Sequence, residues 1–354
     1  MRRITLISIL FIISVAILAQ IPSGYYNTAV GKTEAALKTQ LYTLISHAYN
    51  SSSSPTDVGY SGLYTVYETS DVTSNGKVWD MYSTCIWTPG LKKCGNYSSV
   101  CDCYNREHSI PQSWFDEAAP MVSDAFHVYP TDGKVNGQRS NFPFGECSGG
   151  TTLSGGKGRL GSSTFAGYSG TVFEPDNEYK GDFARTYFYF ATRYQNIMST
   201  IGGESFNNTN YPSFTTWSLN LFLKWHRQDT VSQKEITRNN AVYSYQKNRN
   251  PFIDHPELAE YIWGDKKGTP WSLTAGIENA KLEFNISQTV GAKSLTIKTN
   301  EQNCSCRILS LNGILVERKN ISNTEIQTAN LKEGMYLIEI TAGNRKTIKK
   351  FVVQ

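Results

Sequence analysis

Two stretches of this 354-residue chain are dense in reactive side chains: CYNREHSIPQSWF at residues 103–115 and DAFHVYPTDGKVNGQRSNFPFG at residues 124–145. In the first, the carboxylate of Glu107 directly precedes the imidazole of His108. Such a pair alone is typical of an ordinary protein surface. The second stretch changes that interpretation, because it adds further polar residues close by along the chain: Asp124, His127, Asp132, Asn136, Arg139 and Asn141.

These residue types match the needs of phosphodiester hydrolysis. That reaction uses a hard cation held by oxygen ligands, a base that works near pH 7, and cationic groups that hold phosphate. Glu107 and the amide oxygen of Asn136 suit Mg²⁺, while His108, with an ordinary pKa of about 6.5, suits the base. Arg139 could grip a phosphate through two parallel hydrogen bonds. Two structural alternatives stay open, since Asn136 before Gly137 is also typical of a turn and Arg139 could form a structural ion pair.

Both stretches closely resemble the secreted bacterial endonuclease I family, whose members share a ββα-metal (His-Me finger) active site. The family's N-R-E-H-S-x-P-x-S-W-F segment stands here at 105–115, and its P-T-D-G-x-V-N-G-x-R-S-N segment stands at 130–141. The resemblance extends over residues 32–265. It includes FEPDNEYKGDFARTYFY at 173–189 and NRNPFIDHPELAEYIWG at 248–264.

The resemblance implies a role for each matching residue. His108 would be the general base that activates water, and Glu107 and Asn136 would bind one divalent cation, with Mg²⁺ expected and Mn²⁺ or Ca²⁺ as alternatives. The products would carry 5′-phosphate and 3′-hydroxyl ends. The substrate-binding residues would be Arg139, Asn141 and Arg185. Because phosphate contacts dominate affinity in such enzymes, we expect cleavage of DNA, and as an extension RNA, with little sequence specificity.

Two departures limit what can be carried over. Some relatives carry His where Phe126 stands, whereas this chain has His127 one place later, so the resemblance gives His127 no chemical role. Some relatives also place an arginine in an insertion between the two motifs, and this chain lacks that insertion. The resemblance therefore does not assign the arginine that stabilises the transition state.

The first twenty residues predict export. A basic start at residues 1–3 is followed by an apolar run to Leu18 and by the small residue Ala19, which is the pattern of a secretory signal peptide over residues 1–20. The run is short for a membrane span, so an uncleaved anchor is the lesser alternative. We expect a monomer that is exported through the periplasm to the cell surface or medium, without stable membrane insertion.

Seven cysteines fit an exported protein with disulfides. Five of them cluster at 85, 94, 101, 103 and 147, an odd number that leaves at least one thiol free or paired elsewhere. We favour a bridge between Cys94 and Cys103, which would close a short loop just before the active-site segment, although the sequence does not fix the connectivity. A zinc site is the competing interpretation, and it lacks the second spaced cysteine pair that structural zinc sites show.

The fold class expected is α+β, with a ββα-metal nuclease domain at 32–265, a linker at 266–280 and a small all-β sandwich at 281–354. Helical periodicity appears at 33–49, 182–199, 215–228 and 231–248, and Ser232 with Glu235 forms a capping-box pattern for the last of these. Residues 65–144 are irregular, and residues 148–170, rich in Gly, Ser and Thr, predict an exposed loop.

The C-terminal part alternates apolar and polar residues in the manner of strands. Strands are expected at 294–299, 306–311, 314–319, 336–341 and 346–353, with Asn312-Gly313 as a hairpin turn. The segments LKEGMYLIEIT at 331–341 and KKFVV at 349–353 resemble the C-terminal sorting domain of type IX secretion cargo. The resemblance implies that the secretion machinery is a partner.

Composition is compatible with a nucleic-acid substrate without proving one. The net charge of +4 is a weak indication of a polyanionic partner, and the 39% hydrophobic content is that of a globular protein. Two other functions are alternatives. A metal-dependent hydrolase of another extracellular polymer is disfavoured because the chain has no HExxH motif and no recognisable glycosidase pair of acids. A non-catalytic secreted binding or adhesion protein is disfavoured because the expected base and both ligands are present.

Overall fold

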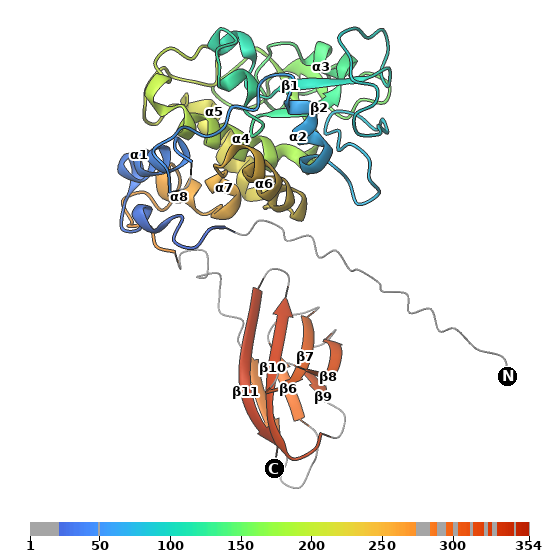
Figure 1. Ribbon diagram of the computed structural model, residues 1–354, viewed down its shortest axis with the longest axis vertical. Helices are drawn as coiled ribbons and strands as arrows, with labels where there is room; N and C mark the ends of the chain where they lie inside the picture. Colours follow the sequence, from blue (N-terminus) through green and yellow to red (C-terminus); the bar gives the residue numbers. More distant parts are fainter. Residues whose placement is uncertain are drawn as a thin grey trace, which may run out of the picture. The chain divides into compact units, whose positions relative to one another are not determined.

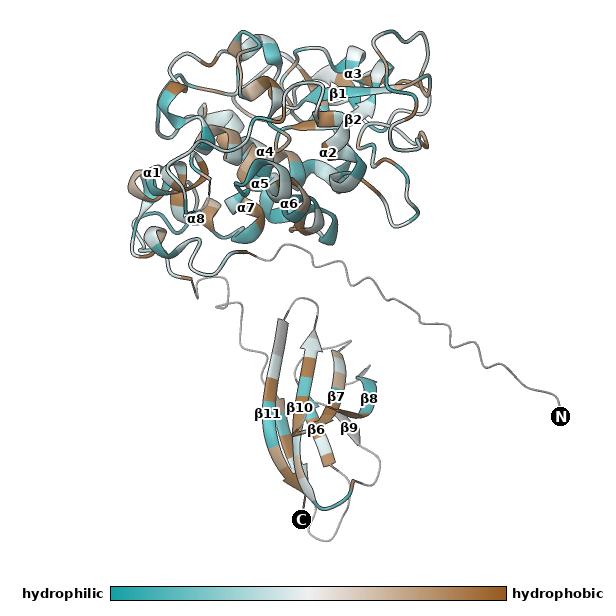
Figure 2. Cartoon of the chain, viewed as in Figure 1, coloured by the Kyte–Doolittle hydropathy of each residue, from teal (hydrophilic) through white to brown (hydrophobic). Residues whose placement is uncertain are grey.

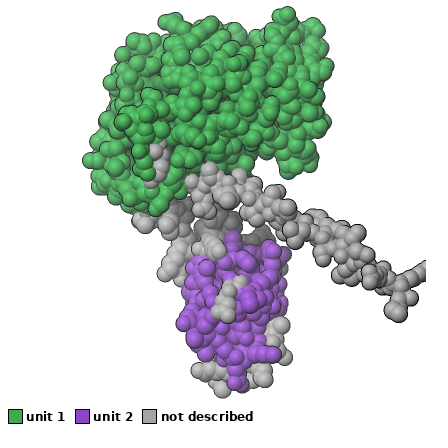
Figure 3. Space-filling model, in the orientation of Figure 1, with its two compact units in different colours: residues 1–273 green, residues 274–354 purple. Residues whose placement is uncertain are grey.

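The computed structural model describes residues 21–48, 50–273, 284–288, 295–299, 304–311, 314–321, 325–327, 331–342 and 345–353. The expected signal peptide at 1–20 and the turn at 312–313 lie outside these residues. The chain divides into two compact units, residues 1–273 and residues 274–354 (Figure 3). Over the described residues, no helix combines the length and apolarity that crossing a bilayer requires.

The first unit is mainly helical (Figure 1). Its helices are α1 Glu34–Ile45, α2 Leu63–Ser70, α3 Gly133–Arg139, α4 Lys180–Arg193, α5 Thr216–Gln228, α6 Gln233–Gln246, α7 Pro251–Asp254 and α8 Leu258–Ile262. Short 3-10 helices lie at Asn27–Ala29, Gln112–Phe115, Met121–Ser123, Asn177–Tyr179 and Gln195–Ile197. Helices α1, α4, α5 and α6 confirm the four predicted helices, and the Ser232–Glu235 capping box of α6 is present.

Helix α4 is the centre of this unit. Every residue from Lys180 to Thr192 is buried, as expected of a helix that is covered on all sides rather than amphipathic. It contacts α1, α5 and α7. At Gly181 an added Cβ would lie 2.1 Å from the carbonyl oxygen of Asp229, so only glycine allows this approach of chain segments.

Two small antiparallel sheets complete the first unit. Strand β1, Tyr104–His108, pairs with β2, Val128–Asp132, and β3, Arg159–Ser162, pairs with β4, Thr171–Glu174. The sequence did not predict β1 and β2 as strands, because five residues are too few to show a clear alternation. Strand β3 lies in the segment 148–170 that was expected to be an exposed loop, so that prediction was wrong for 159–162.

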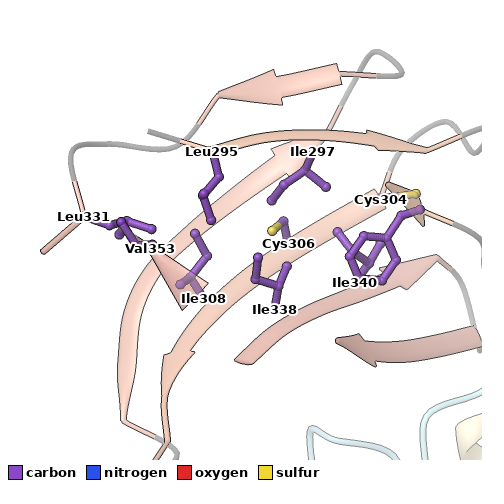
Figure 4. Packing of buried hydrophobic residues seen from close by; sticks show 10 residues of the cluster. Leu295, Ile297, Cys304, Cys306, Ile308, Leu331, Ile338, Ile340 and Val353 are labelled. Carbon is purple, nitrogen blue, oxygen red and sulfur yellow. The ribbon is translucent and has the colours of Figure 1, made fainter. Parts of the chain in front are cut away.

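The second unit is a sandwich of two antiparallel sheets. One has the strand order β11-β10-β7-β8 and the other the order β5-β6-β9. Their bounds are β5 Phe284–Gln288, β6 Leu295–Thr299, β7 Cys304–Ser310, β8 Leu315–Ile321, β9 Glu325–Gln327, β10 Gly334–Ala342 and β11 Arg345–Val353. Hydrophobic and hydrophilic residues alternate along β10 from Ile338 to Thr341 (Figure 2). The apolar side chains of both sheets meet in one core, with Leu295 and Ile297 facing Ile308 and Ile338 (Figure 4).

The nuclease unit continues beyond residue 265, where we expected a linker to begin. Trp271 is fully buried and packs edge-on against Tyr26 and His255. Its backbone forms hydrogen bonds with Gly31 and Lys32. The chain therefore leaves this unit only after Trp271, and residues 266–271 belong to its structure.

Candidate active site

Strands β1 and β2 and helix α3 form one ββα unit (Figure 1). Glu107 on β1 lies opposite Tyr129 on β2, and α3 follows β2 directly. The carboxylate of Asp132 begins α3, because its Oδ1 accepts hydrogen bonds from the backbone N–H groups of Lys134 (2.8 Å) and Val135 (2.9 Å). This cap fixes where the helix starts relative to the strand.

Two disulfides hold the segment that precedes β1. The predicted bridge Cys94–Cys103 is confirmed, and a second bridge joins Cys85 to Cys101. The backbone N–H of Cys101 donates to the other oxygen of Asp132 at 2.7 Å, so the disulfide segment is tied to the start of α3. Because Cys101 and Cys103 are both in disulfides, the zinc alternative for this pair is wrong. Cys147 is a buried thiol outside these bridges.

Glu107 is buried with 1% of its surface exposed. Its Oε1 accepts a hydrogen bond from the Tyr82 hydroxyl at 2.6 Å and forms an ion pair with Arg139 at 2.9 Å. Burial raises the pKa of Glu107, and Arg139 and Tyr82 oppose that shift because both stabilise the charged form. Among the described residues none donates a hydrogen bond to Oε2, so this oxygen keeps its lone pairs for another ligand.

His108 is held by a backbone carbonyl. Its Nε2 lies 3.0 Å from the oxygen of Val122, and because a carbonyl can only accept, the proton must reside on Nε2. The lone pair is then on Nδ1. Burial, followed by the nearby ring of His127, lowers the pKa of His108 to about 3, which makes the ring neutral near pH 7.

Glu107 and His108 point to opposite sides of β1, as neighbours on a strand do. Glu107 contacts Tyr82 and Arg139, whereas the ring of His108 lies 5.8 Å from that of Tyr60. The strand ends at His108.

Asn136 lies inside α3 rather than in a turn, which excludes the turn interpretation. Its Nδ2 donates to the side-chain oxygen of Asn105 at 2.8 Å on β1, so its Oδ1 is left as an acceptor. The following Gly137 is explained by packing, since an added Cβ there would lie 2.1 Å from the Tyr97 hydroxyl oxygen. Asn136 is thus oriented by Asn105, two residues before Glu107.

The structure places both predicted substrate arginines in the interior. Arg139 is 1% exposed and donates to the carbonyl oxygens of His108 (2.7 Å) and Ser109 (2.6 Å), besides its ion pair with Glu107. Arg185 is fully buried, and its guanidinium pairs with Glu235 and the carbonyl oxygen of Asp229. Neither side chain is available to a phosphate, because buried carboxylates already neutralise both. Asn141, just after α3, is exposed, and its contact with substrate stays a prediction.

The sequence motifs did not predict two residues that contribute to the site, Tyr82 and Arg106. Tyr82 reaches Glu107 from 25 residues away along the chain, and no local pattern marks it. Arg106 stands between Asn105 and Glu107 in the recognised motif, so its position was a usable signal. Its guanidinium lies 3.4 Å from the ring centre of Tyr60, a contact that no local sequence pattern indicates.

Comparison with known proteins identifies both units. Residues 33–257, more than half of the chain, match the family model of Endonuclease I, and residues 291–354 match the secretion system C-terminal sorting domain. An extracellular ribonuclease of Bacillus amyloliquefaciens is 36% identical over 251 residues, which cover 68% of this chain and 78% of that protein. An extracellular ribonuclease of Bacillus subtilis is 33% identical with the same coverage. An extracellular deoxyribonuclease of Aeromonas hydrophila is 27% identical over 39% of this chain and 52% of its own length. This chain therefore belongs to the Endonuclease I family and is a secreted nuclease with a C-terminal sorting domain.

Proposed function

We propose that the protein is a metal-dependent endonuclease that hydrolyses the phosphodiester bonds of DNA and RNA with little sequence specificity and leaves 5′-phosphate ends. One observation supports this above all. Glu107, His108 and Asn136 lie on a single ββα unit. In each side chain one polar atom forms a hydrogen bond that orients the group, and the other polar atom forms none with the described residues. Such a site is oriented by its own protein contacts before any ligand arrives.

The free atoms fit one divalent cation. Oε2 of Glu107 and Oδ1 of Asn136 are oxygen donors of the kind that Mg²⁺ prefers, and Mg²⁺ commonly binds through few protein ligands and several waters. Among the described residues no group of three or more His, Cys, Asp and Glu side chains could form an alternative metal site. When bound, the cation would neutralise the charge that develops on the phosphate and on the leaving oxygen.

His108 acts as the base in this proposal. Its Nδ1 takes a proton from a water molecule, whose oxygen forms a bond to phosphorus as the bond between phosphorus and the 3′-oxygen breaks. The leaving 3′-oxygen takes a proton from solvent, which gives 3′-hydroxyl and 5′-phosphate ends. The hydrogen bond from Nε2 to Val122 keeps the ring in place and stabilises the imidazolium that forms.

Attack by water explains why both nucleic acids are proposed as substrates. The ribose 2′-hydroxyl is not needed as nucleophile, so DNA and RNA can follow the same path. The names of the relatives, which include both a ribonuclease and a deoxyribonuclease, are consistent with this breadth. Contacts to phosphate carry no sequence information, and low specificity follows.

A plasmid-nicking assay tests the proposal. The wild-type protein with Mg²⁺ should nick and linearise plasmid, and EDTA should abolish the activity. His108→Ala should lower the rate by roughly 10² to 10⁴-fold, the usual contribution of a general base. His47→Ala is the matched control, because His47 is exposed at the end of α1. Cleavage that survives EDTA or the His108 substitution would refute the mechanism.

The chemistry of the ends is tested separately. Polynucleotide kinase should transfer radioactive phosphate from ATP to the products only after phosphatase treatment, because the 5′ ends of the products already carry phosphate. Products that are labelled directly would contradict the proposed bond cleavage. Sequencing of the ends should show no sharp recognition motif.

A further inference from the structure

We propose that Arg106, held in position by Tyr60, binds the substrate phosphate beside His108. The inference rests on the proposed nuclease function and names a binding residue that the family resemblance leaves unassigned. Arg106 and His108 are two residues apart on β1, so both side chains leave the same face of the strand.

Tyr60 contacts both of these side chains. The guanidinium carbon of Arg106 lies 3.4 Å from the ring centre of Tyr60, and the ring of His108 lies 5.8 Å from the same ring. Arg106 also donates one hydrogen bond to the Tyr60 carbonyl oxygen at 2.9 Å. The cation thus lies over the aromatic face of Tyr60, a residue that is 39% exposed, and that face stabilises it without cancelling its charge.

Most other arginines of residues 21–273 form ion pairs with carboxylates of the described residues, whereas Arg106 does not. Those that form ion pairs with carboxylates are Arg139, Arg159, Arg185, Arg227, Arg238 and Arg249. The remaining one, Arg193, donates a hydrogen bond to Ser46 and stacks on Tyr194. Arg106 has no carboxylate partner among the described residues, and its Nε is buried without a hydrogen-bond partner. It is therefore an uncompensated cation two residues from the proposed base.

The segment that carries Tyr60 is fixed to the same site. Asp57 accepts hydrogen bonds from the backbone N–H of Gly59 (2.8 Å) and from the Ser123 hydroxyl (2.5 Å). Ser123 directly follows Val122, whose carbonyl orients His108. Base and cation are thus positioned by one connected set of contacts. A planar guanidinium held in this way suits the geometry of phosphate oxygens.

Binding of a fluorescent single-stranded oligonucleotide in EDTA tests the proposal without requiring metal or cleavage. Arg106→Gln should weaken binding roughly tenfold or more, the usual effect of losing a charge-assisted hydrogen bond. The dependence of log affinity on log salt should become shallower by about 0.7, the value for one phosphate contact on a single strand. Arg227→Gln is the matched control, since it removes the same charge from a half-exposed ion pair.

Further variants separate positioning from folding. Arg106→Lys should keep the salt dependence while losing part of the affinity, because it keeps the charge and loses the planar group. Tyr60→Ala should weaken binding, and Tyr60→Phe should restore it, since the ring alone supports the guanidinium. In the nicking assay, Arg106→Gln should raise KM.

Unchanged affinity and salt dependence in Arg106→Gln would overturn the proposal and leave the nuclease function intact. If the wild-type protein does not cleave, but Arg106→Gln still weakens its binding of the oligonucleotide, only the nuclease function is refuted.

Discussion

Arg139 is the residue whose role changes most between sequence and structure. Its guanidinium bridges the carboxylate of Glu107 and two carbonyl oxygens at the end of β1, all in the interior. Removing one partner of a buried pair leaves an uncompensated charge, which costs about 3 to 5 kcal/mol. We expect Arg139→Met to lower the free energy of unfolding by about this amount.

A double-mutant cycle in urea measures this coupling. Glu107→Gln combined with Arg139→Met should be less destabilised than the sum of the two single variants, because the double variant leaves no unpaired charge. Additive effects would show that the two side chains do not stabilise each other. A raised KM at unchanged stability in Arg139→Met would instead restore the phosphate-binding role expected from the sequence.

At the residue scale, the sequence identified chemical types but not their partners. Glu107, His108 and Asn136 stand in recognisable motifs, and the structure brings all three to one ββα unit. Arg185 was assigned to substrate because it lies in the segment 173–189 that resembles the family. Its partner Glu235 lies 50 residues away, and no local pattern could reveal that ion pair.

Helix α3 depends on its N-terminal cap, and this sets an expectation at the scale of the element. Asp132→Ala removes the acceptor for Lys134 and Val135 and for the backbone of Cys101. The free energy of unfolding should fall by about 1 to 2 kcal/mol. The cleavage rate should fall as well, because α3 carries Asn136. Asp132→Asn, which keeps one acceptor oxygen, should show the smaller effect in urea unfolding and in nicking. Full stability and activity in Asp132→Ala would contradict this account of the helix.

Helix α5 contains a histidine that makes stability depend on pH. Burial, followed by the charge of Arg185, lowers the pKa of His226 to about 4, while its Nε2 lies 2.9 Å from the Pro256 carbonyl oxygen. Between pH 6.5 and 4 the unfolded chain binds a proton at this position that the folded chain does not bind. Stability from this group is therefore complete above about pH 6.5 and is lost as the pH falls toward 4.

The measurement compares wild type with His226→Gln by urea unfolding at pH 7 and pH 4.5. The loss of unfolding free energy between the two pH values should be about 2 to 3 kcal/mol smaller in the variant. All other titrating groups are common to both proteins and cancel in the comparison. Equal pH dependence would mean that His226 titrates normally in the folded protein.

At the scale of elements, the four helices with clear periodicity were predicted, although the one expected at 182–199 ends at Arg193 as α4. The predicted helix 215–228 corresponds to α5 at Thr216–Gln228, and a capping box marked the start of α6. The elements that build the site were not predicted from periodicity. Strand β1 has five residues and α3 has seven, with a glycine inside it, so each spans only about two periods of its pattern, too few to identify the element. These two elements were located by the family's sequence motifs and not by their helix or strand propensity.

The whole molecule consists of two units with separate cores, and this predicts which truncations are tolerated. A chain that ends at Leu273 should keep the unfolding free energy and cleavage rate of the full chain, because Trp271 remains in place. A chain that ends at Asp265 should lose several kcal/mol, since burying a tryptophan is worth about 3 to 5 kcal/mol. Thermal unfolding and nicking of both chains test this. Equal stability of the two truncated chains would show that residues 266–273 do not belong to the nuclease unit.

The change from helical to strand patterning was visible in the sequence, and the first unit ends at Leu273, inside the stretch 266–280 that was expected to be a linker. The role of Trp271 was not visible, because its contacts with Tyr26 and His255 come from the beginning and the end of the first unit. Contacts between residues so far apart along the chain produce no periodic pattern in the sequence.

The central claim is that Glu107 and Asn136 together hold one divalent cation while His108 stays free to accept a proton. Titration with Mn²⁺, followed by electron paramagnetic resonance, tests it directly on four proteins. The account predicts one bound ion per wild-type chain, loss of that binding in Glu107→Gln and in Asn136→Ala, and retained binding without cleavage in His108→Ala. Unchanged Mn²⁺ binding in both ligand variants, or loss of binding in His108→Ala, would contradict it.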